Sequence, residues 1–187
     1  VYNHIAEDGR EYVISDETAL KLRSEDGRFV KDVDISLFIN DLPSRKDTHA
    51  FSTEDASGST SQAAGIVEGI EAGSRLFLID EDTSATNFMV RDAFMQRVIQ
   101  SDKEPITPFT ARAGELYDNA GISTILVAGS SGAFFHIADT IIQMDNYNAV
   151  DITSKVKALL NEYPVPFDAA SPYTAPKSHR IMSKDPQ

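Results

Sequence analysis

The sequence predicts an α/β fold in which a mostly parallel sheet is flanked by helices. Strand-length apolar runs occur at residues 75–79 and 123–128, and the segments before and between them carry apolar residues at helical spacing. Continuous apolar runs of this length are typical of strands that are buried on both faces. Strands that alternate with helices along a chain usually pair in parallel.

The N-terminal third predicts a different kind of strand pairing. Residues 19–23 and 28–33 are β-prone and flank an Asp-Gly turn, which predicts an N-terminal β-hairpin. Residues 41–61 are rich in Ser, Thr, Asp and Gly and predict an irregular loop. A helix is expected from Gln62, where apolar residues begin to recur at helical spacing.

The remaining chain continues the alternation and then changes character. A third buried strand is expected at residues 140–144, and helices are expected at 87–100, 110–119, 134–138 and 153–162. Residues 164–187 contain several prolines and little periodicity, which predicts a linker or a disordered tail. The folded domain is therefore expected to occupy residues 1–163.

Composition excludes several classes of protein. A chain of 187 residues can build one domain with a sizeable core. The net charge of −12 argues against a broad nucleic-acid-binding surface, and the lack of cysteine excludes disulfides and thiolate metal sites. The apolar runs are too short to span a bilayer, and the first residues do not resemble a secretion signal. We expect a soluble, intracellular protein with no membrane partner.

Two adjacent carboxylates, Asp80 and Glu81, follow the apolar run at 75–79. An acidic residue that closes a buried parallel strand lies at the carboxyl edge of the sheet, where open α/β folds bind ligands. One carboxylate there can hold Mg²⁺ through water, and its neighbour can orient or deprotonate an attacking water. Alternatively, the acidic residues only begin a loop and cap the next helix.

A second candidate element is the run of small residues Ser57-Gly58-Ser59-Thr60 before the first expected helix. Small residues allow main-chain N–H groups to approach a phosphate, and a helix start favours anions. Serine and threonine are also ordinary helix N-caps, so the run alone leaves both interpretations open.

Together, the two elements resemble the ABC class of ATPases. Ser57 to Gln62 corresponds to the signature loop of that class, and the segment from Leu76 to Asn87 corresponds to its Walker B strand and D-loop. More narrowly, the chain is similar to the predicted ATPases of the ABC class over roughly residues 1–157. The resemblance implies an ABC-type P-loop ATPase architecture.

The resemblance also implies roles for individual residues. Asp80 would assist Mg²⁺ through water, and Glu81 would be the catalytic base or water-orienting group. ATP would be contacted by the signature residues of a second protomer and by the loop that occupies the place of the switch histidine. These candidate nucleotide contacts are Ser57, Gly58, Ser59, Thr60, Gly129 and Ser130.

Two departures of the sequence from the pattern bear on the site. No Gly-x-x-x-x-Gly-Lys-Ser/Thr loop occurs, so the ATPase architecture is expected to be incomplete and its Walker A loop to lie before Val1. The given chain alone is therefore expected to be inactive and to bind ATP weakly or not at all. Gly129 and Ser130 stand where an imidazole is usual, and main-chain N–H groups are the candidate substitutes.

The expected function is Mg²⁺-dependent ATP binding and hydrolysis in sites shared by a head-to-tail homodimer that acts on an unknown macromolecular client. Two alternatives remain open: a non-catalytic scaffold that nucleotide holds together, and a factor that handles nucleic acid. For the last, the basic residues of the tail are the candidate contacts, although such residues are more typical of a solvated linker. They are Lys177, His179, Arg180 and Lys184.

Overall fold

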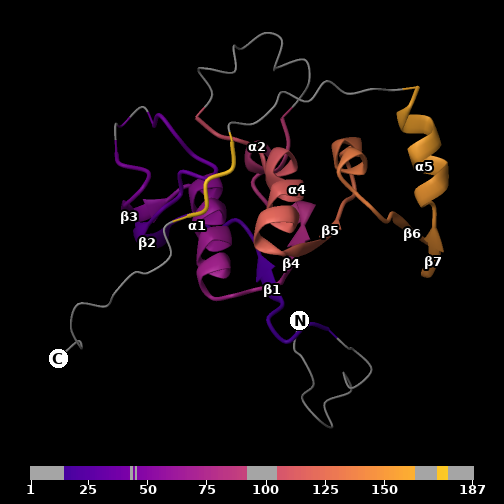
Figure 1. Ribbon diagram of the computed structural model, residues 1–187, viewed down its shortest axis with the longest axis horizontal. Helices are drawn as coiled ribbons and strands as arrows, with labels where there is room; N and C mark the ends of the chain where they lie inside the picture. Colours follow the sequence, from indigo (N-terminus) through magenta and orange to yellow (C-terminus); the bar gives the residue numbers. More distant parts are fainter. Residues whose placement is uncertain (1–14, 43, 45, 92–104, 163–171, 177–187) are drawn as a thin grey trace.

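The centre of the protein is a three-stranded parallel sheet with strand order β1-β4-β5 (Figure 1). The computed structural model describes residues 15–42, 44, 46–91, 105–162 and 172–176. The strands of the sheet are β1 (Leu20–Leu22), β4 (Leu76–Asp80) and β5 (Ser123–Val127). The predicted α/β class, with a parallel sheet and flanking helices, is confirmed.

Helix α1 (Gly58–Glu71) packs closely against this sheet because it carries small residues on its inner face. Ser57 caps its N-terminus by accepting the Thr60 N–H. A methyl group at Gly69 would lie 2.8 Å from both Leu20 and Phe77, so the helix backbone approaches β1 and β4 at contact distance. This close approach determines where the start of α1 lies relative to the end of β4.

Helices α2 (Thr86–Met89) and α4 (Phe109–Ala120) follow β4 along the chain. The Phe88 ring of α2 packs against Phe38, with ring centroids 5.0 Å apart. In α4, Arg112 is 2% exposed and donates from Nε to the Leu37 carbonyl at 3.1 Å. Both helices therefore contribute to one core, which also includes the segment around Phe38.

The predicted pairing of residues 19–23 with 28–33 is wrong. β1 pairs in parallel with β4, whereas β2 (Arg28–Val33) pairs antiparallel with β3 (Phe51–Ala56). The Asp-Gly turn is present, with Gly27 at φ +79°, but it directs the chain from one sheet into another. The prediction of an irregular loop at 41–61 is likewise wrong for β3, which finds a long-range partner in β2. It is also wrong for residues 58–61, because α1 begins at Gly58 and not at Gln62.

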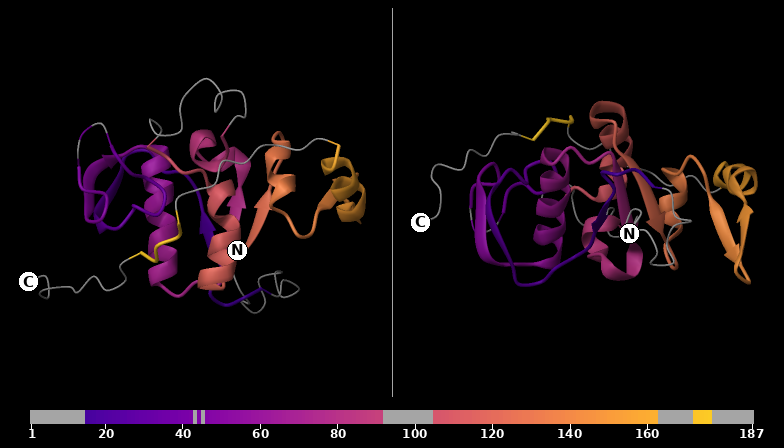
Figure 2. Two further views of the ribbon diagram at one scale, coloured as in Figure 1. Left: turned by 45° about the horizontal axis from the view of Figure 1, so that its top comes forward. Right: turned by 90° about the horizontal axis from the view of Figure 1, so that it is seen from below.

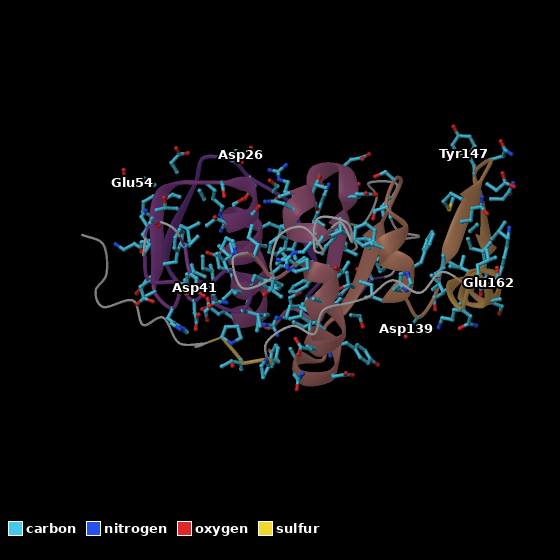
Figure 3. The ribbon with its side chains drawn as sticks, turned by 90° about the horizontal axis from the view of Figure 1, so that it is seen from above. Asp26, Asp41, Glu54, Asp139, Tyr147 and Glu162 are labelled. Atoms are coloured by element: carbon cyan, nitrogen blue, oxygen red, sulfur yellow. The ribbon has the colours of Figure 1, made fainter. Side chains whose placement is uncertain are left out.

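The predicted third buried strand at 140–144 is also wrong. β6 (Ile142–Asp145) is exposed along its length and forms an antiparallel hairpin with β7 (Asn148–Asp151). The turn residues Asn146 and Tyr147 have positive φ, as two-residue hairpins require. Tyr147 lies at the tip of the hairpin and is 99% exposed (Figure 3).

The hairpin and α5 (Thr153–Leu160) lie at the opposite end of the molecule from β2 and β3 (Figures 1 and 2). β5 is a strand as predicted, but it lies at an edge of the sheet, and Ile125 and Val127 are exposed. Its assignment as a buried strand is therefore wrong.

The helix predictions are confirmed at α4 and α5, with ends shifted by a few residues. The expected helix at 134–138 is a 3-10 helix, η3 (Gly132–His136). Of the helix expected at 87–100, α2 is present and ends at Met89, and residues 92–100 lie outside the described part of the chain. Tyr173, in the stretch predicted to be a linker or tail, packs against the core. Among the described residues, no helix is both long and apolar enough to cross a membrane.

Candidate functional site

The start of α1 and the end of β4 lie on the same rim of the molecule. The short turn between α1 and β4 reverses the chain, so the N-terminus of the helix returns to the carboxyl edge of the strand. The carboxamide of Gln62, which is fully buried, joins the two: Nε2 donates to Ser84 Oγ at 3.0 Å, and Oε1 accepts the Ala85 N–H at 2.9 Å. The two candidate elements are therefore neighbours.

The four small residues at the start of α1 differ in what they expose. Ser57 is exposed, its Oγ lies 3.0 Å from Thr60 Oγ1, and the first turn of the helix carries no acidic residue. Ser59 is 7% exposed and donates its hydroxyl to Asn87 Oδ1 at 2.7 Å. The groups that suit an incoming phosphate are thus the Ser57 and Thr60 hydroxyls and the main-chain N–H groups of Gly58 and Ser59, since the Thr60 N–H already donates to Ser57.

Gly58 is packed against the turn that follows β1. A methyl group at Gly58 would lie 2.3 Å from Ser24 Oγ and 3.2 Å from the Asp26 carboxylate. The Ser24 N–H in turn donates to the Thr83 carbonyl at 2.9 Å. Sequence reasoning missed this neighbour because it placed β1 in a hairpin. As a strand of the parallel sheet, β1 would have brought the turn to the same edge as Asp80.

Asp80 ends β4 and begins the 3-10 helix η1 (Glu81–Thr83), which it caps. Its Oδ1 accepts the Asp82 N–H at 3.3 Å, and its carbonyl accepts the Ser84 hydroxyl at 2.8 Å. Asp80 thus caps η1, and this role leaves a half-buried carboxylate at the sheet edge.

Asp80 is the candidate carboxylate for a magnesium ion at this edge of the sheet. No cluster of three or more His, Cys, Asp or Glu side chains suited to a metal ion occurs in the described ranges. Mg²⁺ keeps several waters and is commonly held by one or two carboxylates together with substrate phosphates. The single carboxylate of Asp80 fits an ion that is held mainly by water and phosphate, and it does not fit a cage made by the protein alone.

Glu81 is bound by the loop that follows β5. Oε2 accepts the Gly129 N–H at 2.8 Å and the Ser130 N–H at 3.0 Å, and Oε1 accepts the Ser130 hydroxyl at 2.6 Å. These contacts follow from the sheet register, which places Asp80 beside Val127 on the neighbouring strand. Gly129 and Ser130, predicted to contact nucleotide, therefore contact the predicted catalytic carboxylate.

The same contacts decide the charge of Glu81. The Ser130 hydroxyl bond is the largest cause that lowers the pKa of Glu81 below its ordinary value, and burial opposes it. The main-chain N–H groups of Ser130, Gly129 and Ser131 lower the pKa further. Glu81 is therefore a carboxylate at neutral pH, because each of these donors favours the charged form.

Comparison with known families agrees with this geometry. The family model of the ABC ATPase P-loop domain matches residues 1–180. No curated protein matches the sequence. The matched segment contains the parallel sheet, the start of α1 and both carboxylates at the end of β4. The chain belongs to the ABC ATPase family of P-loop domains, whose members bind and hydrolyse nucleotides.

Proposed function

We propose that the protein hydrolyses ATP with Mg²⁺ in composite sites formed between two protomers. The observation that carries this proposal is the placement of Asp80 and Glu81 at the carboxyl edge of the central strand, on the same rim as the start of α1. A second observation supports it: the first turn of α1 carries the Ser57 and Thr60 hydroxyls and has no acidic residue of its own. Family membership extends the proposal from a phosphate site to a nucleotide.

The two carboxylates have different roles in this proposal. Asp80 would hold Mg²⁺ through water, and the ion would offset charge on the phosphates. Glu81 orients the attacking water and accepts its proton. The water oxygen bonds to the γ-phosphorus while the bond from that phosphorus to the β,γ-bridging oxygen breaks, and the bridging oxygen leaves with ADP and keeps the electron pair.

Ser57, Gly58, Ser59 and Thr60 would contact the nucleotide of the second protomer in a head-to-tail homodimer. The contacts of Gln62 with Ser84 and Ala85 support this, because they make the start of α1 and the segment after β4 a single surface. Since the 187 residues contain no Walker A loop, residues outside them would supply the phosphate cradle. Residues 1–163 would then form the C-terminal part of the ATPase domain, and ATP turnover would act on a macromolecular client.

The test is Glu81→Gln in the full-length protein. Removal of the base should lower ATP turnover by about 100-fold to 10,000-fold while ATP binding is retained. Asp82→Asn is the matched control, because Asp82 is exposed in the same short helix and its carboxylate has no role in the proposal. Equal turnover in the Glu81→Gln variant and the wild type would contradict the proposal.

The same measurement distinguishes the alternative of a non-catalytic scaffold. That alternative has one observation in its favour, namely that three donors already occupy Glu81. A scaffold would bind ATP and show no turnover in the wild type.

The basic tail residues on which a nucleic-acid role would depend lie outside the described part of the chain.

A further inference from the structure

The two oxygens of the Glu81 carboxylate are held unequally. Oε2 accepts two main-chain N–H groups, from Gly129 at 2.8 Å and from Ser130 at 3.0 Å. Oε1 accepts the Ser130 hydroxyl at 2.6 Å. An ionised carboxylate has about four lone-pair sites, two on each oxygen. The donors on Oε2 use both of its sites, whereas Oε1 accepts one close bond. The Ser131 N–H contributes least to lowering the pKa of Glu81 and makes no close bond to either oxygen, so a site on Oε1 is left for a further donor such as water.

The fold explains why these donors are in place. β4 and β5 are neighbours in the sheet, and Glu81 and Gly129 each follow shortly after a matched pair, Asp80 and Val127. The two main-chain donors are present with any residue except proline at these positions. The hydroxyl, by contrast, belongs to the side chain. The short bond to Oε1 therefore depends on the Ser130 side chain alone.

We propose that Ser130 is a positioning residue that acts through Glu81 rather than by binding the triphosphate. With Oε2 fixed by the two main-chain N–H groups, the Ser130 hydroxyl fixes the rotation of the carboxylate and leaves the second lone pair of Oε1 for the attacking water. This inference rests on the proposed function and deepens it, because it assigns the loop after β5 to the base and not to the nucleotide.

The proton transfer assigns a role to each oxygen. As the water oxygen bonds to the γ-phosphorus and the bridging oxygen leaves on ADP, the water proton passes to Oε1 through its remaining lone pair. Oε2 stays bound to the Gly129 and Ser130 N–H groups throughout. Ser130 donates its own proton in a hydrogen bond to Oε1 and neither gains nor loses one.

The experiment compares four single variants and one double variant of the full-length protein in steady-state ATPase and ATP-binding assays. Ser130→Ala removes the hydroxyl, and Ser130→Thr keeps it at an exposed position with room for a methyl group. Ser131→Ala is the matched control, because the Ser131 hydroxyl accepts the Ala133 N–H at 3.3 Å and the substitution keeps its main-chain N–H. Glu81→Gln provides the background in which Ser130→Ala is measured again.

A positioning role predicts a separation between kcat and KM. Ser130→Ala should lower kcat by about 10-fold to 100-fold, the loss typical of a misplaced catalytic group. KM for ATP should stay within about twofold, because ground-state binding is unchanged. Ser130→Thr should restore most of kcat, and Ser131→Ala should match the wild type. In the Glu81→Gln background, Ser130→Ala should have no further effect on turnover.

Two results would overturn the inference while the proposed function stands: an active wild type whose kcat is unchanged by Ser130→Ala, or weaker ATP binding by Ser130→Ala in the Glu81→Gln background. The second result would show that Ser130 binds nucleotide directly. A wild type without ATPase activity would overturn the proposed function and this inference with it.

Discussion

The carboxamide oxygen of Gln62 accepts the main-chain N–H of Ala85 at 2.9 Å, which fastens the first turns of α1 to the segment that follows β4. Both partners come from elements that sequence reasoning identified separately, and their contact is made in the interior, where Gln62 is fully buried. A buried amide that links two loops of a site holds them in a constant relation, because any movement would leave a polar group without a partner.

Gln62→Leu should therefore destabilise the protein. The substitution leaves the Ala85 N–H and the Ser84 hydroxyl without their present partner, which should lower the free energy of unfolding by about 1–3 kcal/mol. Urea denaturation measures this change. Gln143→Leu is the control, because Gln143 lies on the exposed β6 and should change stability by no more than about 0.5 kcal/mol. Equal stability of the two variants would show that the buried amide is dispensable.

Two glycines of α1 should respond in opposite ways to the same substitution. Gly69→Ala places a methyl group 2.8 Å from Leu20 and Phe77 and should lower the free energy of unfolding by about 1–3 kcal/mol. Gly65→Ala meets its nearest atoms at 3.5 Å, which is ordinary contact, and should raise it by about 0.5–1 kcal/mol through helix propensity. Thermal or urea unfolding tests both, and stabilisation by Gly69→Ala would contradict the close packing of α1 on the sheet.

Asp16 should make the stability of the protein depend on pH. Hydrogen bonds from the Thr18 hydroxyl and N–H, and after them the Arg75 charge, lower the pKa of Asp16 below its ordinary value. A carboxyl group whose pKa is lower in the folded state stabilises the fold above its unfolded pKa, and that stabilisation is lost as the pH falls through the folded pKa. Asp16→Asn should therefore be less stable than the wild type at pH 7, and the difference should shrink on acidification below about pH 4.

Salt distinguishes the causes of that shift. Hydrogen bonds from Thr18 make the largest contribution to the lowered pKa of Asp16, and salt does not screen them. The charge of Arg75 makes a smaller contribution, and salt does screen it. In about 1 M sodium chloride, where the screening length is about 3 Å, most of the difference between wild type and Asp16→Asn should persist. Its complete loss in salt would assign the effect to Arg75 instead.

Local pattern was enough to predict α/β character, helices α4 and α5 and strands β4 and β5. These elements have continuous apolar runs or helical spacing, and α4 is capped at its C-terminus by Gly121, which adopts the left-handed conformation that favours glycine. The placement of Asp80 at the end of a strand of the parallel sheet also followed, because the apolar run ends where the carboxylates begin.

The errors share a physical cause, which is that strand partners are chosen by the whole fold. The turn before Arg28 has the composition of a hairpin, yet Leu20 and Leu22 find a better-buried position beside β4. Ile142 and Met144 read as a buried strand, but their partner is the next strand of an exposed hairpin. Burial depends on neighbours that sequence spacing does not specify.

The candidate site, like the fold, was predictable only where its features are local in the sequence. Residue types and their order sufficed to place an acidic pair after a strand and a serine-rich helix start before it, since both patterns are local. Which groups hold Glu81 was decided by the register of β4 and β5, which brings Gly129 and Ser130 to its carboxylate from 48 and 49 residues away. No local rule relates residues at that separation, and only the packed sheet makes them neighbours.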